Sequence, residues 1–306
     1  MDHKITIVGS GNVGATVAQR IVERDLADVV MLDILSDLAM GKALDILESA
    51  PLLGFSATVE GGGDYAMSAG SDICILTAGL TRRPGMSRED LLAKNHDIVR
   101  GTVEQLVKRS PETILLIVTN PLEPMCEVAR RASGFPRERV LGMAGVLDAA
   151  RLRYFVAQEL GVSTSDVDAM ILGGHGDNMI ALPRFITVHG VALTDLLPAA
   201  RIEALIARTR EGGVEIVNYY KQGSAFFTPS AAVVDMVAAI LHDKRKILPC
   251  AALLCGEYGI EDTFVGVPCK LGRRGVESVV ELALQDDELA LVRRSAASVQ
   301  QLVARL

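Results

Sequence analysis

KITIVGSGNVG, residues 4–14, joins an apolar β-branched run directly to the pattern G-x-G-x-x-G. Where a strand turns into a helix, Gly9 permits the tight turn and Gly11 lets a pyrophosphate approach the backbone. Gly14 lets the helix pack closely on the strand. The free N–H groups at the helix N-terminus favour phosphates. We therefore expect a dinucleotide to contact the loop residues Gly9, Ser10, Gly11, Asn12, Val13 and Gly14.

The next apolar run, DVVMLD (28–33), ends in an acid, Asp33, which lies 24 residues after Gly9. A carboxylate at this place accepts hydrogen bonds from both hydroxyls of an adenosine ribose and repels a 2′-phosphate. Ile34 follows, with no arginine or lysine nearby to receive such a phosphate, so NAD is expected rather than NADP. A flavoprotein, a non-catalytic NAD sensor and a methyltransferase share features of this half. The second half of the chain must decide among them.

The first 143 residues alternate short apolar runs with longer amphipathic stretches. Runs that are apolar throughout are typical of parallel strands buried on both faces. We expect strands over 4–9, 28–33, 72–77, 113–120 and 139–144, and helices over 12–24, 37–47 and 87–108. The fold class is therefore α/β, with a doubly wound parallel sheet of the Rossmann type. Segments 61–63 and 82–86 are expected to be loops.

After Val146 the pattern changes to that of a mixed α+β domain. A helix over 148–160 leads into a strand that ends in LGGHGD (172–177), and short extended pieces follow over 181–195. Further helices are expected over 199–221, 229–242 and 286–306, with strands near 247–254 and 264–271. We expect two domains packed against each other, a dinucleotide-binding domain over 1–144 and a substrate domain over 145–306.

Composition excludes several classes of protein. The 306 residues carry 31 Lys and Arg against 38 Asp and Glu, a net charge of −7, which disfavours nucleic acid and anionic membranes as partners. The longest unbroken apolar runs have six residues, whereas a membrane span needs about 20. No signal peptide is visible, and the five cysteines form no CxxC pair. We expect a soluble, cytoplasmic protein with buried, reduced thiols and no metal site.

His175 is the histidine that stands out, because it lies within Leu172-Gly173-Gly174-His175-Gly176-Asp177. Glycines on both sides remove bulk, so the imidazole can face a ligand closely. A histidine framed by three glycines also packs poorly as core filler. The other histidines lie in polar or loop surroundings. We expect His175 to be catalytic.

Asp148 and Arg151 lie three residues apart in VLDAARLR and so share one face of a helix. Such a pair is usually a surface ion pair. Its position at the junction of the two halves suggests a second interpretation. Asp148 would hold a histidine in place, and Arg151 would clamp a carboxylate through two hydrogen bonds.

The segment TRRPGMSR (81–88) follows the strand expected over 72–77. Ligands of doubly wound sheets bind outside the carboxyl ends of the strands. Arg82, Arg83 and Arg88 surround a Pro-Gly pivot, which is typical of a mobile lid that brings positive charge to an anionic substrate. A solvated basic loop is the alternative.

These motifs together resemble the malate dehydrogenases of the lactate-dehydrogenase-like type, over essentially the whole chain. The segments that carry the resemblance are GSGNVG (9–14), TAGLTRRPGMSREDLL (77–92), VTNP (118–121), GVLDAARLR (145–153), GGHGD (173–177) and GGVEIVNYYKQGSAFF (212–227). The resemblance implies that His175 is the acid–base residue and that Asp148 pairs with it. It implies that Arg151 binds the C1 carboxylate of the substrate, that Arg88 polarises its carbonyl, and that Asn120 hydrogen-bonds near the carbonyl and the nicotinamide.

The same resemblance assigns substrate specificity to Arg82. Lactate dehydrogenases carry Gln there, facing the methyl group of pyruvate, whereas an arginine pairs with the second carboxylate of oxaloacetate or malate. Arg83 would point away, and Ser224 and Ala225 would line the substrate pocket. Further cofactor contacts are implied at Thr77, Ala78, Gly79, Asn95, Val118 and Asn120.

Two alternatives to an NAD-dependent malate dehydrogenase remain. One is a dehydrogenase for lactate or another 2-hydroxy acid, against which Arg82 argues. The other is an NAD-binding regulatory protein without turnover, which would not need His175, Asp148 and Arg151 together. The resemblance favours a homotetramer over a dimer. The helices expected over 12–24, 37–47 and 229–241 carry more apolar residues than one buried stripe needs, which indicates association.

Overall fold

The computed structural model describes residues 1–80 and 88–306 of the chain. Its first half contains a parallel sheet with the strand order β3-β2-β1-β4-β5-β6. The strands are β1 (Lys4–Val8), β2 (Asp28–Leu32), β3 (Val59–Gly62), β4 (Ile73–Leu76), β5 (Ile114–Ile117) and β6 (Val140–Gly142). This order confirms the doubly wound Rossmann-type sheet. Because the order reverses between β1 and β4, the loops that follow these two strands face a common crevice.

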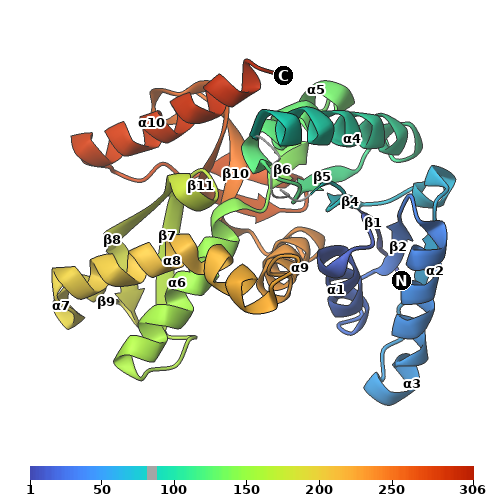
Figure 1. Ribbon diagram of the computed structural model, residues 1–306, viewed down its shortest axis with the longest axis horizontal. Helices are drawn as coiled ribbons and strands as arrows, with labels where there is room; N and C mark the ends of the chain where they lie inside the picture. The colour runs from blue at the N-terminus through green and yellow to red at the C-terminus, as the bar shows by residue number, and fades with distance from the viewer. Residues whose placement is uncertain (81–87) are drawn as a thin grey trace.

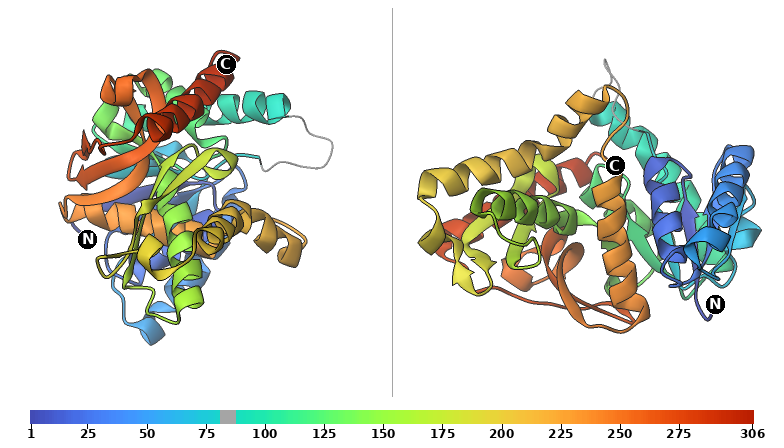
Figure 2. Two further views of the ribbon diagram at one scale, coloured as in Figure 1. Left: turned by 90° about the vertical axis from the view of Figure 1, so that its left-hand side faces the viewer. Right: turned by 90° about the horizontal axis from the view of Figure 1, so that it is seen from below.

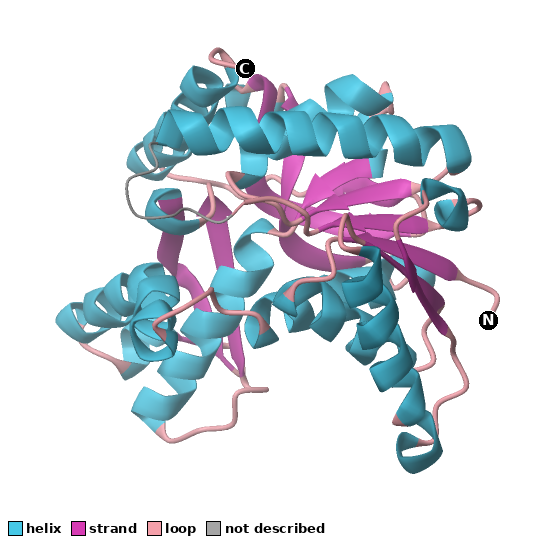
Figure 3. Ribbon diagram, turned by 45° about the vertical axis from the view of Figure 1, so that its right-hand side comes forward, coloured by secondary structure: helices cyan, strands magenta, loops and turns pink. Residues whose placement is uncertain are grey.

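Helices cover both faces of this sheet (Figures 1 and 3). They are α1 (Asn12–Val22), α2 (Ser36–Glu48), α4 (Arg88–Arg109) and α5 (Leu122–Ser133), while the short α3 (Ala50–Leu53) follows α2 and buries no residue. Helices α4 and α5 pack together on one face, above the sheet in Figure 1, and α1 packs on the other. Side chains of β1 alternate between the two layers: Ile5 and Ile7 join the core on the α1 side, and Val8 joins the core on the α4 side.

The second half extends the same sheet. Its helices are α6 (Ala144–Leu160), α7 (Leu193–Leu196), α8 (Ala199–Tyr220), α9 (Phe227–Leu241) and α10 (Asp286–Val303). Its strands are β7 (Val167–Gly173), β8 (Met179–Val188), β9 (Val191–Ala192), β10 (Lys246–Cys255), β11 (Glu261–Gly272) and β12 (Gly275–Val279). Strand β6 pairs antiparallel with β10 through Gly142 and Ala251, and β11, β7, β8 and β9 follow. One sheet therefore runs through both halves of the chain, in addition to any packing between them.

The expectation of a loop over 61–63 was wrong for Gly61 and Gly62, which lie in β3. A β-carbon on Gly61 would overlap the carbonyl oxygen of Ala39 in α2. The glycine is needed because α2 lies directly on this strand, and not because the chain turns there.

Other differences from the expected elements concern the start of a helix, the length of one strand and the presence of another. Helix α6 begins at Ala144 rather than at Asp148, and the short pieces expected over 181–195 include one ten-residue strand, β8. Strand β12 was not expected at all. Strand β8 owes its length to pairing with β7, from Val167 opposite Val188 to Gly173 opposite Met179. Such pairing depends on distant residues, so local patterns do not reveal it.

Helix α9 explains part of the surplus of apolar residues. It lies between α1 and α6 and contacts both, as Figure 2 shows in the view from below. Its Val233 and Val237 are fully buried within the chain. Apolar residues of α1 and α9 are thus buried against other helices of the same chain. Helix α2 differs, since its Leu38 and Leu44 are exposed.

The cysteines are free, and four of the five are buried as expected. Cys255 is exposed, which corrects the expectation for that thiol. It lies at the end of β10, where the pairing with β11 is interrupted by a register shift. Among the described helices, none is long and apolar enough to cross a membrane.

Candidate active site

The glycine-rich loop after β1 has the shape that a pyrophosphate requires. Gly9 adopts a φ of +102°, and a β-carbon there would lie 2.6 Å from the Ala78 nitrogen. A β-carbon on Gly14 would overlap the carbonyl oxygen of Gly9, so this glycine brings α1 close to the loop. Gly11 differs, because no atom lies within 4 Å of its missing β-carbon. The space beside Gly11 and the N–H groups at the start of α1 fit the diphosphate of a dinucleotide.

Asp33 lies immediately beside this loop. Its Oδ2 accepts a hydrogen bond from the Ser10 backbone N–H at 2.6 Å, and its Oδ1 accepts one from the Leu35 N–H at 3.0 Å. These bonds orient the carboxylate at the carboxyl end of β2, where a ribose would lie. Lys42 donates to the Ser10 carbonyl oxygen at 2.7 Å, a contact that the sequence did not indicate. The buried Ser10 hydroxyl has no hydrogen-bond partner among the described residues.

The loops after β4 and β5 are tied to the glycine-rich loop. The Thr77 hydroxyl donates to the Gly9 carbonyl oxygen at 2.8 Å, and the Thr119 hydroxyl donates to that of Ala78 at 2.6 Å. Gly79 is exposed, as is Asn120, whereas Val118 is half-buried. The loops that follow β1, β4 and β5 are therefore held together at the carboxyl ends of these strands.

Asn95, which the resemblance implies as a cofactor contact, lies in α4. Its side chain is fully buried in α4. The side-chain oxygen accepts from the Leu80 N–H at 2.8 Å, and Nδ2 donates to the carbonyl oxygens of Leu80 and Asn120 at 3.1 and 2.6 Å. Both hydrogens of its side-chain amide are engaged, so Asn95 links the loops that follow β4 and β5, and its contact with the cofactor stays a prediction.

His175, Asp148 and Arg151 form one cluster at the junction of α6 with the loop after β7. The His175 Nδ1 lies 2.9 Å from Asp148 Oδ2, and Arg151 Nη1 lies 3.6 Å from Asp148 Oδ1. Asp148 is 1% exposed, so its contacts with these two groups replace contacts with water. With Nδ1 engaged by Asp148, Nε2 of the imidazole is the nitrogen left to face a ligand.

The carboxylate of Asp148 sets the charge of the histidine. Burial on its own would lower the pKa of His175, but attraction to Asp148 and the hydrogen bond with it outweigh burial. The net effect is a pKa above the ordinary value for histidine. The imidazole therefore stays protonated to a higher pH than a histidine in water would.

The Arg151 side chain has the properties of an anion-binding group. Burial lowers the pKa of its guanidinium, and Asp148 opposes that effect. Its Nε is buried and has no hydrogen-bond partner among the described residues. Gly212 of α8 lies against the same side chain, and a β-carbon there would come within 3.1 Å of Arg151 Cδ. An unpaired buried donor beside His175 fits a substrate carboxylate, which binds arginine strongly.

The structure gives less information on the other residues that are expected to bind the substrate. Arg82 and Arg83 lie outside the described residues, and so does the side chain of Arg88, whose backbone begins α4. Ser224 is exposed in the segment between α8 and α9, and Ala225 is half-buried there.

Two residues at this site were missed by the sequence analysis. Glu123, in the first turn of α5, accepts a hydrogen bond from the His175 backbone N–H at 2.9 Å. Ser295 of α10 accepts one from the Gly174 N–H at 2.8 Å. A signal existed for Glu123, because it is an acid two residues after VTNP and within an otherwise apolar helix start. Ser295 carries no such signal.

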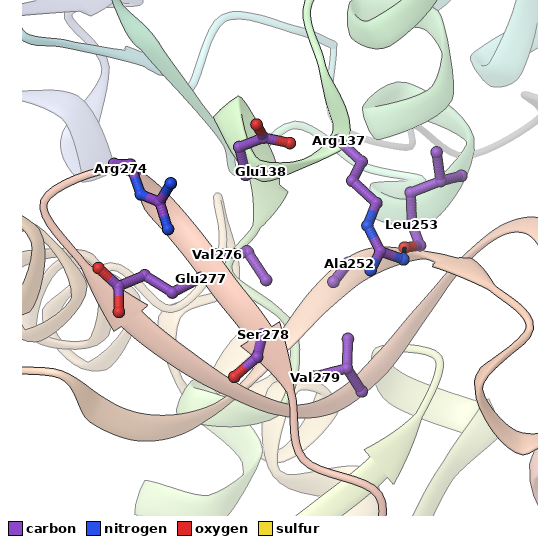
Figure 4. A pocket seen from close by; sticks show the side chains of 9 residues that line it. All are labelled: Arg137, Glu138, Ala252, Leu253, Arg274, Val276, Glu277, Ser278 and Val279. Carbon is purple, nitrogen blue, oxygen red and sulfur yellow. Dashed lines mark hydrogen bonds between the residues drawn. The ribbon is translucent and has the colours of Figure 1, made fainter.

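A separate cavity, of about 200 Å³, contains none of these residues. It lies between β10, β12 and the turn before β6, and Figure 4 shows its lining. Arg137, Arg274, Glu138 and Glu277 give it mixed charge. Within the described part of the chain, no group of three or more His, Cys, Asp or Glu could hold a metal ion.

Both halves of the chain match models of one protein family. Residues 3–142 match the lactate/malate dehydrogenase NAD binding domain, and residues 145–305 match the alpha/beta C-terminal domain. The chain belongs to the lactate/malate dehydrogenase family. The malate dehydrogenase of Roseiflexus castenholzii is 51% identical to it over 306 residues, which are 100% of this chain and 99% of that protein.

Solved structures of the family have the same fold as this chain. The malate dehydrogenase of Salinibacter ruber is similar with a TM-score of 0.95 and 50% identity, covering 99% of this chain and 97% of that one. The lactate dehydrogenase of Cryptosporidium parvum, solved with lactic acid and nicotinamide adenine dinucleotide, has the same TM-score at 38% identity, with 99% and 97% covered. The fold is thus common to both activities of the family, and the substrate must be decided by side chains.

Proposed function

We propose that this chain is an NAD-dependent malate dehydrogenase, which interconverts malate and oxaloacetate. The observation that carries the proposal is the cluster in which His175 is bound to Asp148 and lies beside Arg151, whose buried Nε has no hydrogen-bond partner among the described residues. Its full-length relatives of about 50% identity are malate dehydrogenases. The space beside Gly11 and the carboxylate of Asp33 fit NAD.

Each residue of the cluster has a distinct task in the proposed reaction. Arg151 binds the C1 carboxylate, which places the substrate carbonyl next to His175. NADH, when bound, supplies the hydride for reduction. His175 donates a proton from Nε2 to the carbonyl oxygen, and Asp148 stabilises the protonated imidazole through Nδ1. In malate oxidation His175 must be neutral and accepts that proton.

Four further residues that the resemblance singles out have roles in the proposed reaction. Arg88 polarises the carbonyl and stabilises negative charge that develops on its oxygen. Arg82 pairs with the second carboxylate and so selects a dicarboxylate over pyruvate. Asn120, which follows β5, hydrogen-bonds near the carbonyl and the nicotinamide, and Ser224 lines the pocket. The division into a nucleotide domain (1–144) and a substrate domain (145–306) belongs to the same proposal.

We further propose that the protein is a cytoplasmic homo-oligomer, with a tetramer favoured over a dimer. Support comes from α2, where Leu38, Met40 and Leu44 are 40, 55 and 58% exposed. An apolar surface of this kind, on one helix, is typical of a contact between proteins.

The test is the oxidation of NADH by the purified chain with oxaloacetate or with pyruvate. We expect kcat/KM for oxaloacetate to exceed that for pyruvate by about 100-fold or more. In His175→Asn, kcat falls by about 100-fold or more while the Kd for NADH is unchanged. A preference for pyruvate would make the chain a lactate dehydrogenase. Absence of turnover with intact NADH binding would make it a non-catalytic NAD-binding protein.

A further inference from the structure

The loop that carries His175 is rich in glycine. Gly173 and Gly176 have φ values of +79° and +82°, in the left-handed region that glycine tolerates best. A segment rich in glycine does not fix the position of a side chain by itself. The imidazole must therefore be held by bonds from other elements, and the structure provides them at three places.

The three bonds come from three different helices. Asp148 of α6 holds the ring at Nδ1, and Ser295 of α10 accepts from the Gly174 N–H. Glu123 of α5 accepts from the backbone N–H of His175 itself at 2.9 Å. Of these, α5 alone belongs to the nucleotide-binding half, and Glu123 lies three residues after Asn120. The bond of Glu123 thus connects the loop of His175 with the cofactor side of the crevice.

Burial of the Glu123 carboxyl group costs stability, so its presence needs an explanation such as the bond to the His175 N–H. Its side chain is 6% exposed, and no lysine or arginine of the described part is paired with it. Burial raises the pKa of the carboxyl group, and the bond from the His175 N–H opposes that effect. Its position in the first turn of α5 stabilises a negative charge only partly. An apolar side chain of similar size would pack here without that cost.

The next acid on the same helix shows the contrast. Glu127 is buried to the same degree, but it is paired with two arginines, at 2.8 Å from Arg130 and 2.6 Å from Arg131. The interactions of Glu127 are confined to α5 and stabilise that helix. Those of Glu123 are directed at the backbone of the candidate catalytic histidine.

We infer that Glu123 is a positioning residue, which fixes the loop of His175 against the nucleotide-binding half so that the imidazole is aligned with the cofactor and the substrate. The inference rests on the proposed function for its kinetic consequence. The described charged groups around His175 are Glu123 of α5 and Asp148 and Arg151 of α6.

Three variants of the full-length chain test the inference. Glu123→Leu removes the acceptor, and we expect kcat for oxaloacetate to fall by about tenfold or more, because small displacements of a catalytic group are costly. The Kd for NADH should stay within about threefold. Glu123→Gln keeps an oxygen that accepts from the His175 N–H, so its kcat should stay within about threefold of the original. Glu123→Asp withdraws the acceptor by one methylene and should lie between the two.

Hydrogen exchange of the backbone amides over 172–178 gives a readout that needs no turnover. We expect exchange at His175 to accelerate by about fivefold or more in Glu123→Leu and to change little in Glu123→Gln. The matched control is Glu127→Gln, which should lower the thermal midpoint while leaving kcat and the exchange of this loop unchanged. If Glu123→Leu does not fold, Glu123→Asp supplies both measurements.

Several results would overturn the inference. They are an unchanged kcat in Glu123→Leu and Glu123→Asp, unchanged exchange at His175, or an equal loss of NADH binding and kcat, which would indicate general loosening. If the unaltered chain oxidises NADH with neither substrate, the proposed function fails, and the exchange experiment still decides the role of Glu123.

Discussion

At the scale of single residues, the chemistry depends on how buried charges are paired. Asp148 is the common partner of His175 and Arg151, and it is almost fully buried. A carboxylate in that position favours the protonated imidazole and keeps Nε2 available. The His175 imidazole is hydrogen-bonded to Asp148, whereas the Nε of Arg151 has no partner among the described residues and can bind a carboxylate.

Asp148→Asn tests the electrostatic part of this arrangement. The pKa of His175 is raised in the folded protein, so oxaloacetate reduction, which needs the protonated ring, persists up to that pKa and is lost above it. Without the carboxylate the pKa falls. We expect the alkaline limb of oxaloacetate reduction and the acid limb of malate oxidation both to move to lower pH. Profiles of kcat/KM against pH measure the shift, and limbs that stay in place would show that Asp148 does not control His175.

Arg82→Gln tests the choice of substrate. An arginine paired with a buried carboxylate is charge-assisted, and leaving the carboxylate without its partner costs on the order of 3–5 kcal/mol. We expect kcat/KM for oxaloacetate to fall by roughly two to four orders of magnitude, while that for pyruvate rises. Arg83→Gln is the control and should change either value by less than about tenfold. A specificity switch in Arg83→Gln alone would mean that the two arginines exchange roles.

At the scale of elements, the junction of β1 and α1 shows glycines with separate tasks. Gly14 lies where a β-carbon would overlap the backbone of Gly9, whereas Gly11 borders open space. Gly14 is therefore needed for the packing of the protein itself. The φ of Gly11 is −67°, which suits any residue, so a glycine is needed at that position only for the approach of a ligand.

Gly14→Ala and Gly11→Ala are therefore a matched pair. We expect Gly14→Ala to destabilise the protein by about 1–3 kcal/mol or more, because backbone must move to admit the methyl group. Gly11→Ala should change the free energy of unfolding by less than about 1 kcal/mol. It should nevertheless weaken NADH binding by about tenfold or more, because its methyl group occupies the space of the pyrophosphate. Thermal unfolding and NADH titration measure both effects, and equal stability loss in the two variants would contradict this division of tasks.

At the scale of the whole molecule, one sheet runs through both halves, and α9 packs between α1 and α6. The halves are thus joined by hydrogen bonds as well as by side-chain packing. The remaining unpartnered apolar surface includes α2, with Leu38, Met40 and Leu44 exposed.

Leu44→Glu tests whether α2 is a contact between subunits. A charge placed in an apolar interface is left without a partner, so we expect the dissociation constant of the assembly to rise by about tenfold or more. Sedimentation across a range of protein concentrations measures it. Val162→Glu, at a half-exposed valine far from α2 in the sequence, is the control. An unchanged assembly in Leu44→Glu would remove α2 from the interface, and a monomeric parent chain would contradict the proposed oligomer.

The sequence by itself determined the Rossmann-type first half, the tight turn at Gly9, the close packing at Gly14, and the place of Asp33 at the end of β2. These features follow from rules that act within a few residues, namely the permitted backbone angles of glycine and the apolar pattern of buried parallel strands. His175 could also be singled out, because its glycine neighbours are adjacent in the chain.

Only the tertiary structure showed which further residues hold the loop of His175. Glu123 lies 52 residues from His175, and Ser295 lies 121 residues from Gly174. The strand role of Gly61, the pairing of β6 with β10 and the burial of Asn95 likewise depend on elements that are distant along the chain. Burial and hydrogen bonding need two partners, and a local sequence pattern contains only one of them when the other lies far away in the chain. The partner is settled only when the whole chain has packed.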